Sequence, residues 1–177
     1  GSGTSILGAQ QSNVSGVGID FNPMCVDLSN AKVMNLTSDE KTIIEDWIVL
    51  LQEWLVEYQI SYNENRSKIK KFFNESNFKT LCGIYDLLQS SKSDLGDRLY
   101  VFIKSAWMAC IEEGSDRKRD GNGLKIVKSK IENIEVFFTD KLRNMCQNSE
   151  SQSGVSFQLH HLTFEGSATK DIPRVVS

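Results

Sequence analysis

Residues that could carry out acid–base chemistry are sparse in this sequence. The two histidines, His160 and His161, are adjacent near the C-terminal end, so a site that pairs a histidine base with a nucleophile would have to form there. Acidic neighbours such as Glu112 and Glu113 point in different directions on a helix, which is typical of a solvated face. We therefore predict a protein that is not an enzyme and has no cofactor. A site assembled by folding, from separated carboxylates or a cysteine, is the remaining catalytic alternative.

The cysteines do not form a metal-binding pattern. A zinc site normally uses two close pairs of ligands, but the chain contains no CxxC pair; its cysteines are Cys25, Cys82, Cys110 and Cys146. Cys82 and Cys110 fall on apolar stripes of predicted helices, so we interpret them as buried thiols. Free thiols favour an intracellular location, cytoplasmic or nuclear.

The segment 116–127 starts like a calcium-binding loop but departs from that pattern at two positions. Its third position is Lys118, and its twelfth is Val127, where calcium needs a bidentate glutamate. No glycine-rich phosphate-binding motif occurs elsewhere in the chain. The sequence therefore predicts no metal site and no nucleotide site.

Basic residues gather in two clusters, although the formal net charge of the chain is −3. Such clusters can neutralise phosphates and release counterions, which makes binding to nucleic acid or to another anionic surface an alternative function. The net negative charge argues against strong nucleic-acid affinity, and simple solvation also explains the clusters. Their members are Arg66, Lys68, Lys70 and Lys71 in one, and Arg117, Lys118, Arg119, Lys125 and Lys128 in the other.

The middle of the chain has the periodicity of helices. No proline interrupts the sequence between Pro23 and Pro173, and apolar residues recur at 3.6-residue spacing. Short loops favour antiparallel packing, so we expect an all-α fold, an antiparallel helical bundle of four or five helices. No apolar run reaches the roughly 18–20 residues of a membrane span. The predicted helices cover 38–60, 65–73, 77–90, 95–113 and 124–147, with a loop at 114–123 and with Ser76 and Asp94 as caps.

The two ends of the chain differ from this helical middle. Residues 1–35 are glycine-rich and predict a flexible N-terminal segment with a short extended piece at 17–21. The bundle domain follows at 36–147, and 148–177 reads as a linker with an extended tail. Alternation at 155–160 is typical of a short strand. A lone strand needs a partner, for which the N-terminal extended piece and a bound protein are both candidates.

The most unusual feature is a helix that is apolar on two sides. In the predicted helix 38–60, one stripe passes through Trp47 and Trp54, and Val49, Val56 and Ile60 lie opposite it. Such a helix is either central in its bundle or faces a partner. We expect a non-enzymatic adaptor or scaffold domain in which these residues bind a helix or extended peptide of another protein, with acidic residues selecting basic ones at the rim. Those acids are Glu45, Glu53 and Glu57.

Overall fold

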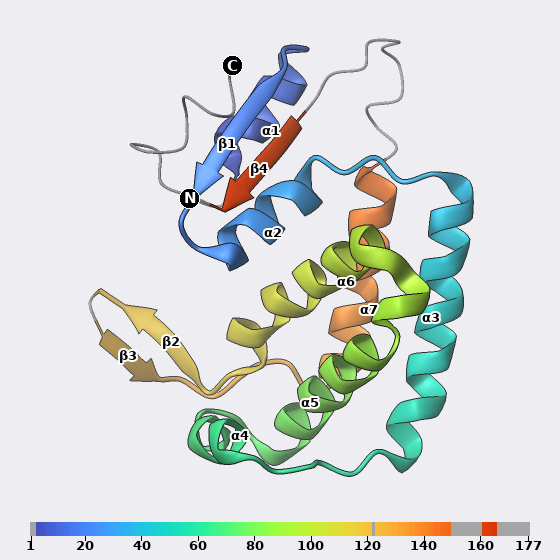
Figure 1. Ribbon diagram of the computed structural model, residues 1–177. Coiled ribbons are helices and arrows are strands. Elements are labelled where there is room, and N and C mark those ends of the chain that lie inside the picture. The colour runs from blue at the N-terminus through green and yellow to red at the C-terminus, as the bar shows by residue number, and fades with distance from the viewer. Residues whose placement is uncertain (1–2, 122, 150–160, 166–177) are drawn as a thin grey trace. The chain divides into compact units, whose positions relative to one another are not determined.

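The computed structural model describes residues 3–121, 123–149 and 161–165 (Figure 1). The chain divides into two compact units, one formed by Gly1–Thr37 with Cys146–Ser177 and the other by Ser38–Met145. The described residues are mostly helical, as the sequence predicts, with a few short strands. The elements are α1 (Thr4–Gln11), β1 (Gly16–Asp20), α2 (Pro23–Lys32), α3 (Ser38–Glu57), α4 (Glu64–Ile69), η1 (Lys70–Phe72), α5 (Glu75–Ser90), α6 (Lys92–Gly114), β2 (Arg117–Asp120), β3 (Gly123–Ile126), α7 (Ile134–Asn148) and β4 (His161–Glu165).

Helix α3 packs on α5 and α6 through a stripe that includes Trp47 of the predicted stripe but not Trp54. Its buried side chains are Ile44, Trp47, Ile48 and Leu51. The other apolar stripe, Ile43, Leu50 and Trp54, keeps about two fifths or more of its surface exposed. Periodicity cannot separate two adjacent apolar stripes, because both repeat at 3.6 residues. The side that α5 and α6 cover decides which one becomes the core.

The centre of the helical unit is closed by aliphatic and aromatic side chains from α5, α6 and α7. The edge of Trp47 meets the ring of Phe138 with centroids 6.2 Å apart. Helix α5 approaches α3 closely at Gly83, where an added Cβ would lie 2.5 Å from the Leu55 side chain. The fully buried side chains include Ile84, Leu88, Phe102, Ile103, Phe138 and Leu142.

Helix boundaries differ from the predicted ones where asparagine caps are present. Asn74, and not Ser76, caps α5, because its side chain accepts the backbone N–H of Asn77 at 2.8 Å. Helix α6 begins at Lys92 and is interrupted at Gly96, whose φ of +68° suits glycine. Asp94 therefore lies inside this element and is not its cap.

The largest correction concerns residues 114–133, for which the sequence predicts a loop and the start of a helix. Strands β2 and β3 instead form an antiparallel hairpin in which Lys118 pairs with Lys125 and Arg119 with Leu124. Helix α7 starts only at Ile134, after Asn133 has accepted the backbone N–H groups of the first turn. The turn residue Gly121 has a φ of +60°, so the chain reverses direction here instead of continuing into a helix.

The first unit holds regular structure where the sequence predicts a flexible segment. Helices α1 and α2 flank strand β1, and the Asn22 side chain caps α2 by accepting the N–H of Met24. Strand β1 pairs in parallel with β4, from Gly16 opposite His161 to Asp20 opposite Glu165. The predicted extended piece at 17–21 thus falls largely in β1, and its partner β4 lies beyond the segment for which the sequence predicts a strand. The predicted alternation at 155–160 lies outside the described residues.

Candidate functional site

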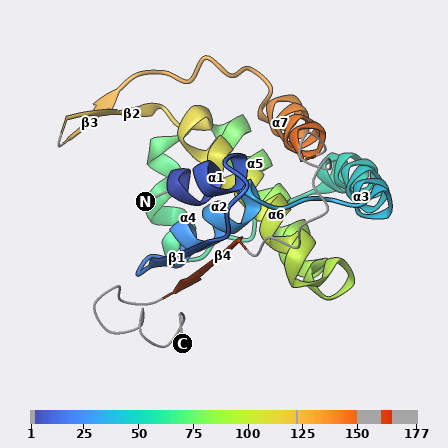
Figure 2. The same cartoon turned by 90° about the horizontal axis from the view of Figure 1, so that it is seen from above.

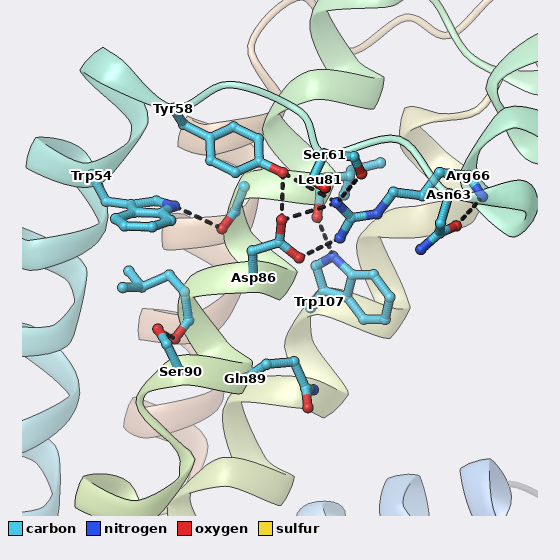
Figure 3. Close-up of polar contacts among 12 residues, drawn as sticks. Trp54, Tyr58, Ser61, Asn63, Arg66, Leu81, Asp86, Gln89, Ser90 and Trp107 are labelled. Atoms are coloured by element: carbon cyan, nitrogen blue, oxygen red, sulfur yellow. Dashed lines mark hydrogen bonds and ion pairs between the residues drawn. The ribbon is translucent and has the colours of Figure 1, made fainter.

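A partly buried polar network joins α3, α4 and α5. The Tyr58 hydroxyl donates to Asp86 Oδ2 at 2.6 Å, and the Arg66 guanidinium donates to both oxygens of the same carboxylate, at 3.0 Å from Nη1 to Oδ2 (Figure 3). Arg66 Nη1 also donates to the carbonyl oxygen of Ser61 at 2.9 Å. The two-pronged contact with a carboxylate fixes orientation as well as charge. This network therefore ties the C-terminal end of α3 and the start of α4 to the middle of α5.

The network shifts the protonation of its members in consistent directions. Burial raises the pKa of the Asp86 carboxyl, but the hydrogen bonds from Arg66 and Tyr58 and the charge of Arg66 outweigh it, so that the pKa is lowered. Burial first, and then the hydrogen bond to Asp86, raise the pKa of Tyr58. The carboxylate of Asp86 and the neutral phenol of Tyr58 are both stabilised by the fold. The three side chains are thus bonded to one another as an ion pair with an added hydroxyl donor.

An open cavity of about 580 Å³ lies beside this network, on the exposed apolar stripe of α3. Leu50 is 46% exposed and Trp54 is 40% exposed, and together they give the cavity an apolar wall. The indole N–H of Trp54 donates to the carbonyl oxygen of Gly83 at 3.2 Å, which fixes the ring across α5. We call this cavity the acidic groove; its lining residues are Leu50, Glu53, Trp54, Glu57, Tyr58, Gln59 and Asp86.

The charge of the acidic groove comes from two carboxylates at its rim. Glu53 and Glu57 are exposed, and neither has an ion-pair partner among the residues that the structure describes. They follow each other by four residues on α3, so both project on the same side of the helix as the Trp54 wall. The groove thus combines an apolar wall with uncompensated negative charge.

A second cavity, of about 330 Å³, lies across the Arg66–Asp86 pair from the acidic groove. The rings of Tyr85 and Trp107 contact each other on its wall, tilted by 31° with centroids 4.8 Å apart. The indole N–H of Trp107 donates to the carbonyl oxygen of Leu81 at 2.9 Å. Arg66 lines this cavity, while its partner Asp86 lines the acidic groove. The ion pair therefore stands between the two cavities and is shared by both.

The predicted partner-binding residues do not lie on one surface in the structure. Glu53 and Glu57 line the acidic groove, whereas Val49 and Val56, 55% and 79% exposed, lie on another side of α3 and do not line it. Glu45 is engaged by Arg143 of α7, with Nη2 and Oε2 at 3.0 Å.

Ile60 differs from its predicted place on the helix. Helix α3 ends at Glu57, and Ile60 packs, partly buried, against the cluster of Tyr58, Phe78 and Cys82. The chain turns toward α4 before the predicted face can continue, so Ile60 belongs to the packing of this corner.

The first basic cluster is largely neutralised within the fold. Arg66 is bound to Asp86, Lys68 to Glu64 at 2.5 Å, and Lys70 approaches Glu75 at 3.9 Å and also lies over the ring of Tyr62. Lys71 lies over the ring of Phe72. Three members of this cluster are therefore ion-paired within the fold, whereas Lys71 keeps its positive charge.

The second basic cluster forms the hairpin and the segment after it. Lys118 is paired with Glu113 at 2.8 Å, and Arg117 lies over the ring of Phe72. Lys125 and Lys128 are exposed, and neither has a partner in the described part of the chain. Arg119 belongs to β2. Lys125 and Lys128 thus place unpaired positive charge in and beyond β3.

Sequence reasoning missed Asp86 and its pairing with Arg66. The available signal was a single carboxylate inside the otherwise apolar stretch 81–88, because a charge in such a place needs a partner. Trp54 belongs to the predicted stripe of Trp47, yet it forms the wall of the groove together with Leu50. No spacing rule distinguishes an apolar residue of the wall from one of the core, because both recur at helical spacing.

Metal ligands, membrane-spanning helices, cysteines and histidines were the other features considered in the sequence, and the described residues place them as follows. No group of histidine, cysteine and acidic side chains there is arranged to hold a metal ion, and no helix there is long and apolar enough to cross a membrane. Cys82 and Cys110 are buried, as predicted, and burial raises the pKa of Cys110 to about 12. His160 lies outside the described residues, and His161 is the first residue of β4.

No family model matches the sequence, and neither a curated protein nor a solved structure matches the chain. The assignment of a function therefore rests on the geometry of the acidic groove and of the surfaces around it.

Proposed function

We propose that the helical unit, interpreted from its sequence as an antiparallel bundle, is a non-enzymatic protein-interaction domain whose acidic groove binds a basic, partly apolar segment of a partner. The observation that carries this proposal is the combination of an exposed Leu50–Trp54 wall with the unpaired carboxylates of Glu53 and Glu57. Burial of apolar surface would supply affinity, at roughly 25 cal/mol per Å², and the rim carboxylates would select lysine or arginine.

The network beneath the groove supports this role by holding its wall in place. Trp54 is fixed by its hydrogen bond to Gly83 and by Tyr58, whose ring centroid lies 5.9 Å away. Tyr58 in turn is held by Asp86. A wall that is ordered before the partner arrives loses less conformational entropy on binding.

Fluorescence anisotropy with a labelled amphipathic Leu/Lys peptide tests the proposal, and the same peptide with glutamate in place of lysine is the probe control. We expect the Leu/Lys peptide alone to bind. Leu50→Asp should weaken its binding at least tenfold, because the substitution places a charge on the wall of the groove. Glu53→Lys with Glu57→Lys should weaken it through repulsion. Circular dichroism of each variant checks the fold.

The matched control is Val49→Asp with Val56→Asp, on the same helix but outside the groove. If these substitutions abolish peptide binding while Leu50→Asp does not, the valine face is the docking surface and the groove is not. Equal binding of the Leu/Lys and Leu/Glu peptides would remove the role of the rim carboxylates.

The alternative function, binding to nucleic acid or another anionic surface, is favoured by one observation: the free charge of Lys125 and Lys128 on and after the hairpin. It predicts binding to single-stranded RNA or to phosphatidylserine vesicles that weakens steeply as salt rises. Lys125→Glu with Lys128→Glu should abolish that binding and leave the Leu/Lys peptide bound. Binding that is insensitive to salt would contradict this alternative.

A further inference from the structure

The β2–β3 hairpin exposes apolar side chains next to free positive charge. Leu124 is 62% exposed and Ile126 is 71% exposed, and both point to the same face of β3 because side chains alternate along a strand. Lys125, Lys128 and Lys130 are exposed, and the described residues contain no ion-pair partner for any of them. Apolar side chains beside positive charge complement the apolar wall and the carboxylates of the acidic groove.

The hairpin is held at its base and so presents these side chains in a defined direction. The backbone N–H of Asp116 donates to the carbonyl oxygen of Phe72 at 2.7 Å, and its carboxylate accepts the N–H of Ser129 at 2.8 Å. The Ser129 hydroxyl donates to the carbonyl oxygen of Glu113 at 2.6 Å. Both strands of the hairpin are therefore tied where they leave and rejoin the helices.

The hairpin and α3 lie on opposite sides of the helical unit in both Figure 1 and Figure 2. The two elements belong to the same compact unit, Ser38–Met145. A hairpin anchored at Asp116 and Ser129 cannot reach across that unit to the groove of its own chain. A contact between the two surfaces must therefore join two copies.

We propose that the β2–β3 hairpin of one copy occupies the acidic groove of a second copy, with Leu124 and Ile126 against the Leu50–Trp54 wall. Lys125 points to the other face of β3, so its charge acts at the edge of the contact, and Lys128, beyond the strand, faces the carboxylates of Glu53 and Glu57. This inference rests on the proposed function of the groove and names its occupant. The argument for a second copy is charge complementarity between two surfaces of one chain, each of which lacks a partner inside the described fold.

The contact is heterologous, because one surface of a copy meets a different surface of the next. Such contacts propagate head to tail, as a ring or an open chain of copies. A hairpin tip covers a small area, and small interfaces are weak. Self-association in the micromolar range that weakens with rising salt is therefore expected.

Sedimentation velocity of the full chain, over a range of protein concentrations at low and high salt, tests the proposal. The groove variant is Leu50→Asp, and the hairpin variant is Leu124→Asp with Ile126→Asp. We expect the unaltered protein to associate at low salt and each variant alone to stay monomeric, with association weakened at least tenfold. An equimolar mixture of the two variants should form a 1:1 heterodimer and nothing larger, because one intact hairpin then meets one intact groove.

Two outcomes overturn the inference. A groove variant that still self-associates would show that the hairpin pairs with another surface. A monomeric unaltered protein that still binds the Leu/Lys peptide would refute the second copy as occupant and leave the proposed function standing. If hairpin-dependent binding to phosphatidylserine vesicles or RNA accompanies that monomeric state, the hairpin serves an anionic surface instead. Loss of both self-association and peptide binding would remove the proposed function as well.

Discussion

The acidic groove and the β2–β3 hairpin carry opposite charges, and different contacts hold them in place. The wall of the groove is built on α3, whose inner stripe is closed by the core of the helical unit. The hairpin projects from its base at Asp116 and Ser129, and β3 is exposed throughout. Groove residues therefore combine packing with the proposed binding, whereas substitution of the exposed residues of β3 should cost the fold little. Substitutions in the two regions should separate these roles.

The largest effect on stability is expected at Asn77, which connects α5 to both ends of the hairpin segment. Its side-chain Nδ2 donates to the carbonyl oxygens of Gly114 at 3.1 Å and Ile131 at 3.3 Å, and the residue is buried. Asn77→Leu leaves both carbonyl groups without this donor, which should lower the free energy of unfolding by about 2–3 kcal/mol. Urea denaturation measures this loss. An unchanged unfolding midpoint would mean that the hairpin base does not depend on α5.

The next largest effect on stability is expected at Asp86, which lies under the groove and whose contribution depends on pH. The pKa of Asp86 is lowered in the fold, so its contribution is present above the ordinary aspartate pKa of about 4 and is lost as pH falls through the lowered value. Asp86→Asn should cost about 1–2 kcal/mol at neutral pH and flatten the loss of stability in acid. Thermal unfolding of both proteins from neutral to acidic pH checks this. Curves that stay parallel would contradict it.

A third comparison sets one residue of the groove against one of the hairpin. Trp54→Ala removes a ring that packs near Tyr58 and bonds to Gly83, and about 1–2 kcal/mol of stability should be lost. Leu124→Ser alters an exposed residue and should change stability by less than about 0.5 kcal/mol. Chemical denaturation of the two variants in parallel gives the difference. Equal losses would show that the hairpin is part of the core.

The smallest effect is expected inside the hairpin itself. Lys118 and Lys125 stand opposite each other in the register, and like charges in that position are unfavourable. Lys125→Glu should raise stability by a few tenths of a kcal/mol while it weakens self-association. Lys128→Glu, outside the paired strands, serves as the control, because it should weaken association without the gain in stability. A destabilised Lys125→Glu variant would refute the pairing as the cause.

Much of the helical content could be predicted from the sequence, because α3, α5 and α6 carry long apolar stripes without proline. Pattern alone could not place the hairpin. Leu124 and Val127 fit a helical stripe, but Gly121 and Gly123 favour reversal of the chain, and the bonds of Asp116 to Phe72 and Ser129 join parts far apart in sequence. The groove was predicted only in part: Glu53 and Glu57 are among the predicted partner-binding residues, but they line the groove together with Trp54 and not with Val49 and Val56.

The parallel pairing of β1 with β4 also has a consequence for the order in which the protein is made. Strand β1 can pair with β4 only after β4, which begins at His161, has been synthesised. Every contact within Ser38–Met145, by contrast, becomes possible once that stretch has left the ribosome. Contacts so distant along the chain are slow to form. The helical unit should therefore mature during translation, and the unit that contains β1 and β4 should be completed only after the synthesis of β4.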